Sequence, residues 1–306
     1  MNRNIRNFVL HNSFLRELFF ILKGKKVNCK KIDKKIQRFK VYSDECSVLN
    51  DVIISLTSYG DRLSELQYTL YSLVKQTVKP EKIIVNLSST DMNKITPILL
   101  SFQKYGVEFR ETEDTKSYKK LIPTLQRYPN KIIVTADDDL FYPKDWLKKL
   151  WINHLLFPQD IICHITAKIT YKDKKINPYN EWIFNKKETT SSFSNLILSG
   201  GGTLFPVNSL YKDACKKDLF LKLSPNADDI WDYFMALLNG TKIKQIPNSY
   251  VNVKYTNPYR EYGLLGEGET LAQINVGENQ NDRQFKAVME YYHISEVDFI
   301  NKLCEK

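Results

Sequence analysis

Short apolar runs alternate with amphipathic stretches through the first half of the chain. Runs rich in β-branched residues predict strands over 51–59, 82–87, 107–112 and 131–136. Between them, apolar residues at helical spacing predict helices over 62–76, 92–105 and 117–127. Strands of this kind that alternate with helices predict a mostly parallel sheet with helices on both faces. Ligands of such sheets bind beyond the carboxyl ends of the strands, so the segments after each strand are the first places to look for a site.

The second half of the chain has a less regular pattern. It predicts, in chain order, a helix over 144–156, a strand over 160–170, a polar loop over 171–195, a helix from about 207, a helix over 228–239 and a helix over 283–304. Residues 252–283 are rich in Asn, Gly, Glu and Tyr and show no period. A long irregular segment of this type is typical of a functional lid or of disorder. The pattern as a whole indicates a basic amphipathic arm over 1–45, a main α/β domain over 46–250, and a lid-like segment with a C-terminal helix over 251–306.

Composition indicates a globular protein whose excess charge lies at one end. Of the 306 residues, 42% are hydrophobic, which is enough for a sizeable core. The net charge is +10, and residues 1–40 alone hold 12 Lys and Arg against 2 Asp and Glu. The rest of the chain is therefore neutral. An enzyme of nucleic acids usually carries cations over its whole binding face, so nucleic acid is not an expected partner.

The basic arm has the pattern of an amphipathic helix. Apolar residues at roughly helical spacing, followed by a cluster of lysines, are Phe8, Leu15, Leu18, Phe19 and Leu22 with Lys23, Lys25 and Lys26. A helix of this kind can lie on an anionic membrane surface. The alternative is a helix that packs on the protein's own core. No run of 18 apolar residues occurs, so a spanning helix is not expected.

The five cysteines have neither zinc-ligand nor disulfide-framework spacing, and a reducing compartment is the default.

The strongest local signal is the acidic triplet Asp137-Asp138-Asp139, directly after the strand at 131–136. Three adjacent carboxylates repel one another unless a cation lies among them. Oxygen ligands of this type suit Mg²⁺ or Mn²⁺, which also bind substrate phosphates. The alternative is an acidic loop that starts the following helix. The triplet predicts a site for Mn²⁺ or Mg²⁺.

A second acidic pair and a glycine triplet are further candidates. Asp228 and Asp229 precede an apolar helix, where one Asp is expected as a cap and a second is available as a general base. Gly200, Gly201 and Gly202 interrupt an apolar run, so the backbone there can approach a ligand or form a simple bulge.

Weaker candidates follow the strand ends. They are Thr57, Tyr59 and Arg62 after the first strand, Asp114 after the third, and Lys119 and Lys120, which have the reach to contact phosphates. Each alone is also consistent with a solvated surface residue. His164 lies in an apolar run and is expected to be a core histidine rather than a metal ligand. The sequence contains no P-loop, GxGxxG, GxSxG or HExxH motif.

Four blocks, in order, resemble bacterial family-2-like glycosyltransferases of the GT-A fold, the type found with capsule and surface-polysaccharide synthesis. The blocks are IISLTSYGDR (53–62), SYKKLIPTLQRYP running into IIVTADDDLFYPKDWL (117–147), SGGGTLFP (199–206) and ADDIWDYFMALL (227–238). The resemblance covers about two thirds of the chain and excludes the arm and the C-terminal tail. It implies an α/β nucleotide-diphospho-sugar transferase fold, with a mostly parallel sheet flanked by helices.

The resemblance also implies roles for single residues. Asp137 and Asp139 match the DxD motif that holds the metal on a nucleotide diphosphate, with Asp138 between them. Thr57, Tyr59, Arg62 and, more loosely, Asp114 match positions of the nucleotide pocket. Gly200, Gly201 and Gly202 match the block beside the donor sugar. The pair Asp228-Asp229 matches the acidic pair whose second member is the base in inverting enzymes.

These observations predict a metal-dependent glycosyltransferase of the hexosyltransferase type. It would move a sugar from a nucleotide-sugar donor, with UDP-sugars favoured, to a growing and lipid-linked surface glycan of the capsule or lipopolysaccharide type. The expected location is the cytoplasmic face of the bacterial plasma membrane, with residues 1–40 on the anionic surface. The alternatives are a sugar-nucleotide nucleotidyltransferase, which usually has a Gly-rich basic loop after its first strand, and a non-catalytic protein that binds the membrane surface.

Overall fold

The computed structural model describes residues 27–38, 47–184, 189–247, 254–257 and 279–305. Among these residues, a seven-stranded sheet in the order β13-β6-β12-β4-β1-β2-β3 forms the centre of the molecule. Its strands are β1 (Val48–Thr57), β2 (Lys79–Leu87), β3 (Val107–Glu111), β4 (Ile132–Thr135), β6 (Ile161–Cys163), β12 (Thr203–Phe205) and β13 (Ile243–Gln245). Every pairing in it is parallel except those of β12, which runs antiparallel to β4 and β6. The predicted fold class, a mostly parallel α/β sheet flanked by helices, is confirmed.

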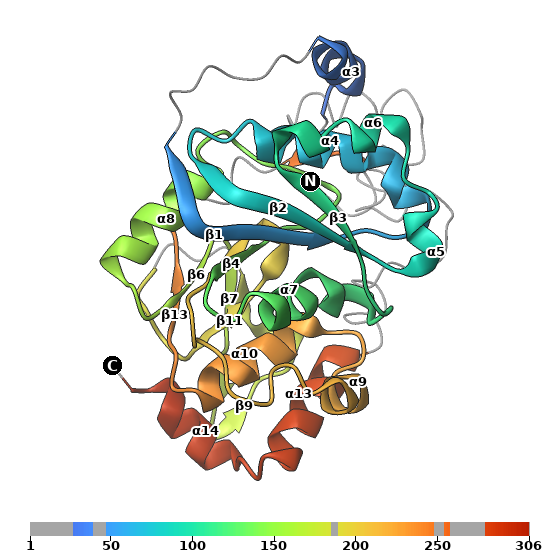
Figure 1. The fold of residues 1–306 in the computed structure, drawn as a ribbon. Coiled ribbons are helices and arrows are strands. Elements are labelled where there is room, and N and C mark those ends of the chain that lie inside the picture. Colours follow the sequence, from blue (N-terminus) through green and yellow to red (C-terminus); the bar gives the residue numbers. More distant parts are fainter. Residues whose placement is uncertain (1–26, 39–46, 185–188, 248–253, 258–278, 306) are drawn as a thin grey trace, which may run out of the picture.

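Helices cover both faces of this sheet (Figure 1). One face carries α3 (Cys29–Gln37), α4 (Leu63–Val74), α5 (Ser89–Met92), α6 (Pro97–Leu100) and α8 (Trp146–Leu156). The other carries α7 (Ile122–Arg127), α9 (Lys217–Leu223), α10 (Asp228–Leu238), α13 (Gln280–Tyr291) and α14 (Glu296–Leu303). Strand β1 has apolar side chains for both faces. Val52, Ile54 and Leu56 pack into the core beneath α4 and α8, and Ile53 packs into the core on the side of α10. Side chains of a strand alternate between faces, so an unbroken apolar run is what a doubly covered sheet needs.

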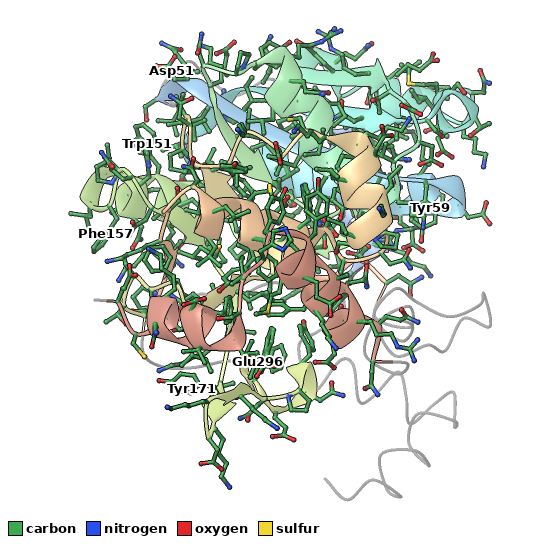
Figure 2. The ribbon with its side chains drawn as sticks, turned by 90° about the horizontal axis from the view of Figure 1, so that it is seen from below. Asp51, Tyr59, Trp151, Phe157, Tyr171 and Glu296 are labelled. Atoms are coloured by element: carbon green, nitrogen blue, oxygen red, sulfur yellow. The ribbon has the colours of Figure 1, made fainter. Side chains whose placement is uncertain are left out.

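Small sheets complete the fold. They pair β10 (Ile183–Phe184) and β11 (Asn195–Ile197) with β7 (Thr166–Lys168), β14 (Lys254–Tyr255) with β5 (Leu140–Phe141), and β8 (Tyr171–Lys172) with β9 (Lys175–Ile176). Figure 2 shows Asp51 and Tyr59 on opposite sides of the molecule, near the two ends of β1. The residues after Thr57 therefore lie at the carboxyl end of β1, at one edge of the molecule.

Several predicted elements have different boundaries in the structure. The predicted helix 92–105 contains the end of α5 and two separate short turns, because Thr96 caps a new helix that begins at Pro97. The predicted strand 160–170 is divided between β6 and β7, which belong to different sheets.

Two further corrections concern the helices of the second half of the chain. The helix predicted from about 207 begins only at Lys217. The helix predicted over 283–304 is two helices, because His293 has a positive φ of 54° and Ser295 caps α14 through a hydrogen bond from Asp298 N. The loop predicted over 171–195 contains the short strands β8, β9 and β10.

Candidate active site

A cavity of about 600 Å³ opens at the carboxyl ends of β1 and β4 and reaches the first turn of α10. Ligand pockets of proteins are commonly about 300–1,000 Å³. The candidate residues that line it are Thr57, Tyr59, Arg62, Asp114, Lys119, Lys120, Asp137, Asp138, Asp139, Gly200, Asp228 and Asp229. Segments that are far apart in the sequence therefore meet at one place. The position beyond the strand ends is the one that the sheet pattern predicts.

The first cation among the acidic triplet is Arg62. Its guanidinium forms ion pairs with Asp138 and, at 2.8 Å, with Asp139, and its Nε donates to Asp138 Oδ2 at 3.0 Å. Arg62 lies in the turn that leads from β1 into α4. The sequence identified the repulsion between these carboxylates, but it did not identify Arg62 as their partner. Part of the charge that was expected to need a metal is thus balanced by the protein itself.

Asp138 lines the cavity, but its carboxylate is largely buried and is held by protein groups. It is 5% exposed, and its carboxylate also accepts a hydrogen bond of 2.6 Å from Ser58 Oγ. Its backbone carbonyl accepts a second hydrogen bond from Thr69 on α4. These contacts support a role for Asp138 in fixing the triplet. Its predicted contact with the donor stays a prediction.

Lys120 joins the two acidic motifs. Its ammonium lies 3.2 Å from Asp137 Oδ1 and 2.8 Å from Asp228 Oδ2, and it donates a hydrogen bond to Ser199 Oγ. Burial alone lowers the pKa of Lys120, but Asp137, Asp228 and Asp229 more than offset it, and the pKa lies well above the usual value. Lys120 is therefore a permanent cation between the triplet, the acidic pair and the glycine segment.

Asp229 has the electrostatic environment of a general base. Burial and the neighbouring charge of Asp228 raise its pKa to about 7, against the opposing effects of Lys120 and the hydrogen bond from Ser199. Ser199 N donates to Asp229 Oδ1 at 3.1 Å and fixes the carboxylate beside the glycine segment. A base with a pKa near the working pH combines the ionised form with useful proton affinity.

Asp232, one turn further along α10, differs from Asp229. It is 2% exposed, and burial together with the charges of Asp228 and Asp229 raises its pKa well above the usual value. Burial thus favours the neutral form of this carboxyl group. The sequence analysis did not identify Asp232.

The three glycines of 200–202 have different surroundings. A Cβ at Gly200 would lie 2.9 Å from Asp137 Oδ2, so only this glycine allows close approach to the cavity. A Cβ at Gly201 would meet Ile165 at 2.5 Å, and one at Gly202 would meet Trp146 at 2.4 Å. Gly202 also has φ +106°. Gly201 and Gly202 do not line the cavity, and their missing side chains serve packing against β7 and α8.

The remaining predicted residues surround the outer part of the cavity. Asp114 receives a 2.7 Å contact from Lys119 Nζ, and this hydrogen bond lowers the pKa of the Asp114 carboxyl. The ring of Tyr59 is 54% exposed and lies under the Arg62 guanidinium, 5.3 Å from it. Thr57 Oγ1 donates to the carbonyl of Asn86 at the end of β2. Their predicted contacts with a nucleotide stay predictions.

Several residues of the site were not identified from the sequence. Tyr142 accepts a hydrogen bond from Asp137 N at 2.8 Å and donates one to the Gly200 carbonyl at 3.1 Å, which joins the triplet to the glycine segment. Tyr179 and Asn281 also line the cavity. They come from the segment read as a loop and from α13, which packs on α10. Of these residues, only Tyr142 lies within one of the four blocks that resemble glycosyltransferases.

The carboxylates fit a metal only if a substrate contributes ligands. Asp137 and Asp139 are partly exposed, with 32% and 21% of their side-chain surface accessible. No group of three or more His, Cys, Asp or Glu with metal-site geometry exists among the residues that the structure describes. Mg²⁺ and Mn²⁺ are often held by one or two carboxylates plus phosphate oxygens. The donor set therefore suits an ion that arrives with a diphosphate.

Segment 254–257, in the C-terminal part of the chain, forms hydrogen bonds with residues beside the cavity. Thr256 N donates to the Asp139 carbonyl at 2.8 Å, and Asn257 bonds Glu65 on α4 at 2.8 Å. Most of the predicted lid over 252–283 lies outside the described residues.

Three other predictions concern residues away from the cavity. His164 is a buried core residue, as expected: its Nε2 lies 3.1 Å from the Trp146 carbonyl, and burial lowers its pKa to about 4. Among the described residues, Cys29, Cys163, Cys215 and Cys304 form no disulfide, and Cys46 lies outside the described residues.

The amphipathic segment predicted within residues 1–26 also lies outside the described part of the chain. In the parts that are described, no helix is both long and apolar enough to cross a membrane.

Comparisons with known proteins give distant likenesses of fold. No family model matches the sequence, and no curated protein matches it significantly. Residues 1–349 of TarS from Staphylococcus aureus align with a TM-score of 0.44 and 16% identity over 71% of this chain and 63% of that one. The same TarS fragment in complex with UDP gives 0.45 and 15%, over 84% and 75%.

A synthase gives a similar score. The 4-diphosphocytidyl-2C-methyl-D-erythritol synthase from Anaerococcus prevotii aligns at 0.43 and 15% identity, over 73% of this chain and 96% of that one. The chain spans less than two thirds of TarS 1–349 in the first alignment. The side chains of the cavity, not these alignments, support the function proposed below.

Proposed function

We propose that this protein is a glycosyltransferase that moves a sugar from a nucleotide-sugar donor to a glycan acceptor. The observation that carries the proposal is the meeting, around one cavity, of the triplet after β4, the acidic pair that begins α10, and Lys120 between them. One acidic group is suited to a diphosphate with its cation, and the other to a hydroxyl that must lose its proton. Glycosyl transfer needs both functions within one site.

The donor side of the cavity is the edge formed by β1 and β4. Tyr59 offers an exposed ring for a nucleotide base, and Asp137 and Asp139 would hold a Mn²⁺ or Mg²⁺ ion together with the donor diphosphate. When bound, the ion supplies charge neutralisation for the leaving diphosphate. Arg62 and Lys120 fix the two carboxylates before the donor arrives, so little rearrangement is needed on binding.

The acceptor side is the first turn of α10. Asp229 Oδ2 would take the proton of an acceptor hydroxyl, while Oδ1 stays fixed by the Ser199 amide. The pKa of about 7 lets Asp229 accept this proton and return it to solvent. Direct attack with a base of this type predicts inversion at the anomeric carbon. Asp228 is neutralised by Lys120 and serves to position Lys120 and Asp229.

The finer assignments complete the proposal. A UDP-sugar is the favoured donor and a lipid-linked surface glycan, of the capsule or lipopolysaccharide type, the favoured acceptor. The basic residues of 1–40 would hold the enzyme on the inner face of the bacterial membrane.

A sugar-nucleotide nucleotidyltransferase is the second candidate. Such an enzyme catalyses the attack of a sugar phosphate on a nucleoside triphosphate. It needs cations after the first strand that are available to bind the triphosphate. Here the cation of that turn, Arg62, is bound to Asp138 and Asp139. This contact favours the glycosyltransferase.

Nucleotide-dependent thermal stabilisation tests donor binding. The purified protein is heated with UDP, GDP, CDP or CMP, each with and without Mn²⁺, because a ligand that binds the native state raises the melting temperature. We expect a rise with one diphosphate that requires Mn²⁺ and disappears in Asp139→Ala. Asp173→Asn, an exposed change in the turn between β8 and β9, is the matched control and should keep the rise. No rise with any nucleotide would favour the non-catalytic alternative.

A further inference from the structure

A second large cavity lies outside the candidate active site, between α3, α4 and the segment after β5. Its volume is about 690 Å³. Six of the residues that line it are basic: Lys31, Lys34, Lys35, Arg38, Lys75 and Lys144. None of its described lining residues is acidic. The site described above is rich in carboxylates, so the two cavities have opposite electrostatic character.

Helical spacing explains how α3 supplies four of these cations. Counted from Lys31, the other three cations lie three, four and seven positions further along, so all four fall on one side of the helix. They are Lys34, Lys35 and the C-cap residue Arg38. Ile32 is 8% exposed and anchors α3 on the core beside α4. Asp33, the acidic residue of α3, faces the other way and accepts a hydrogen bond from Gln67.

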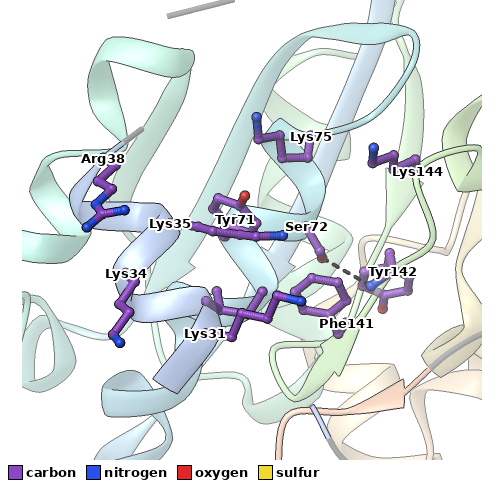
Figure 3. A pocket seen from close by; sticks show the side chains of 11 residues that line it. Lys31, Lys34, Lys35, Arg38, Tyr71, Ser72, Lys75, Phe141, Tyr142 and Lys144 are labelled. Atoms are coloured by element: carbon purple, nitrogen blue, oxygen red, sulfur yellow. Dashed lines mark hydrogen bonds between the residues drawn. The ribbon is translucent and has the colours of Figure 1, made fainter. Parts of the chain in front are cut away.

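The opposite wall comes from the body of the protein. Figure 3 shows Lys31 and Lys35 extending from α3 toward Phe141 and Tyr71, with Lys75 and Lys144 on the other side of the cavity. Burial, followed by the charges of Lys144 and Lys35, lowers the pKa of Lys75 to about 8. Asp145, next to Lys144, is paired with Lys149 at 2.8 Å. Cations from both walls thus line one cavity, which favours an anion as its ligand.

The cavity also has an apolar lining. The rings of Tyr71 and Phe141 lie with centroids 6.5 Å apart, and Tyr142 is fixed by the hydrogen bond from its backbone N to Ser72 Oγ, drawn in Figure 3. A concave site with cations around aromatic walls fits a small anion better than a flat membrane surface.

We propose that this cavity binds a phosphate-bearing small molecule with at least two negative charges. Lysine ammonium groups act as mobile point charges for phosphate oxygens, and those from α3 face those from the body across the opening. The site is separate from the nucleotide site and does not depend on the proposed function. Tyr142 connects the two places: it lines the basic cavity, and its hydroxyl accepts a hydrogen bond from Asp137 N and donates one to the Gly200 carbonyl.

Calorimetric titration with pyrophosphate tests this proposal. The buffer contains a chelator, because without a divalent ion the acidic cavity should not bind pyrophosphate. The test variant is Lys35→Gln/Lys144→Gln, which removes one exposed cation from each wall. The control is Lys172→Gln/Lys175→Gln, which makes the same charge change on the distant strands β8 and β9.

We expect pyrophosphate to bind the unchanged protein and the control equally and the test variant about tenfold more weakly. Metal-dependent stabilisation by the nucleotide should be the same in all three proteins. Equal affinity in the test variant, or equal weakening in both variants, would overturn the proposal. A parallel measurement with phosphatidylglycerol vesicles separates the sources of phosphate. Loss of vesicle binding in the test variant, with no pyrophosphate binding to the unchanged protein, would assign the lysines to a membrane surface instead.

Discussion

At the scale of single residues, Asp229 and Asp232 differ in what their environments allow. Both lie near Asp228 and Lys120. Burial and Asp228 raise the pKa of Asp229 to about 7, and burial raises the pKa of Asp232 well above the usual value. We predict that Asp229→Asn lowers the transfer rate by about 10²-fold or more, the usual contribution of a general base. Donor binding should be nearly unchanged, since Asn keeps the shape and the bond to Ser199 N. The measurements are kcat and the Kd for the nucleotide.

Asp232→Asn is the matched control for this change. Asn keeps the shape of the Asp232 side chain, and Asp232 does not line the cavity, so the variant should retain most of the rate. Full activity in Asp229→Asn would remove Asp229 from the mechanism.

The same pKa predicts how stability depends on pH. The folded protein holds the Asp229 proton up to about pH 7, whereas the ordinary value is 3.8. Between these values the folded state binds more protons than the unfolded state, so this group's contribution makes stability fall as pH rises. Asp229→Asn removes that contribution. The melting temperature of the variant should therefore exceed that of the unchanged protein by more at pH 8 than at pH 4.5, and a constant difference would contradict the assigned pKa.

Arg62 is predicted to matter for folding as well as for the site. It pairs with Asp138, and the two side chains are only 19% and 6% exposed. Arg62→Gln leaves a buried carboxylate without its cation, which costs about 3 kcal/mol of the free energy of unfolding. Arg110→Gln is the control, because its partner Glu108 is 33% exposed and the loss should be about 0–1 kcal/mol. Chemical denaturation measures both, and equal losses would contradict the structural role of Arg62.

The sequence predicted the residues of the site better than their partners. Strand ends and the acidic repeats pointed to Asp137, Asp139 and Asp229, and these residues line one cavity. Asp137 and Asp139 follow a strand of the sheet, where ligands of such sheets bind. The pairing of Arg62 with the triplet and of Lys120 with Asp228 depends on how α4 and α10 approach the sheet. No local pattern contains that information.

At the scale of elements, residues 199–202 show how one segment can serve both packing and chemistry. A Cβ at Gly202 would overlap Trp146 of α8, at a φ of +106°. We predict that Gly202→Ala destabilises the protein by more than about 3 kcal/mol, from strain and overpacking together. Gly106→Ala is the control, because Gly106 has φ +84° and a Cβ there would have no neighbour within 4 Å. Its loss of stability should reflect backbone strain alone, about 1–2 kcal/mol. Equal losses in the two variants would show that the contact with Trp146 does not matter.

Gly200→Ala should affect the site rather than stability. Its Cβ would press on Asp137 Oδ2, the far end of a side chain that can rotate. We expect a small change in melting temperature and a clear weakening of Mn²⁺-dependent nucleotide binding, measured by titration. Unchanged binding would argue against a role of Asp137 in holding the diphosphate.

Element boundaries were predictable where periodicity alone determines them. The strands β1 to β4 and the helices α4, α8 and α10 have long apolar patterns and were found close to their observed bounds. The predicted helix 92–105 failed because capping by Thr96 competes with a continuous apolar pattern. The single strand 160–170 failed because Ile161–Cys163 and Thr166–Lys168 satisfy their hydrogen bonds in two different sheets.

At the scale of the whole molecule, the sheet separates two cores and presents one acidic and one basic cavity. The acidic cavity joins strand ends, α10 and α13, so the C-terminal helices contribute directly to it through Asn281. The basic cavity joins α3 to the body. The segment 139–142 contributes to both, which places the two ligands proposed here on either side of one short stretch of chain.

The most direct test of the central claim is the identity of the products formed from a nucleotide sugar. The protein is incubated with UDP-sugars, Mn²⁺ and a glycan acceptor, and the phosphorus products are followed by NMR. Release of UDP, lost in Asp229→Asn and kept in Asp232→Asn, is the predicted result, because the bond that breaks joins the sugar to the diphosphate. A parallel incubation contains UTP and a sugar phosphate in place of the UDP-sugar and the acceptor. Formation of pyrophosphate there, with no release of UDP in the first incubation, would contradict the account and assign the site to nucleotidyl transfer.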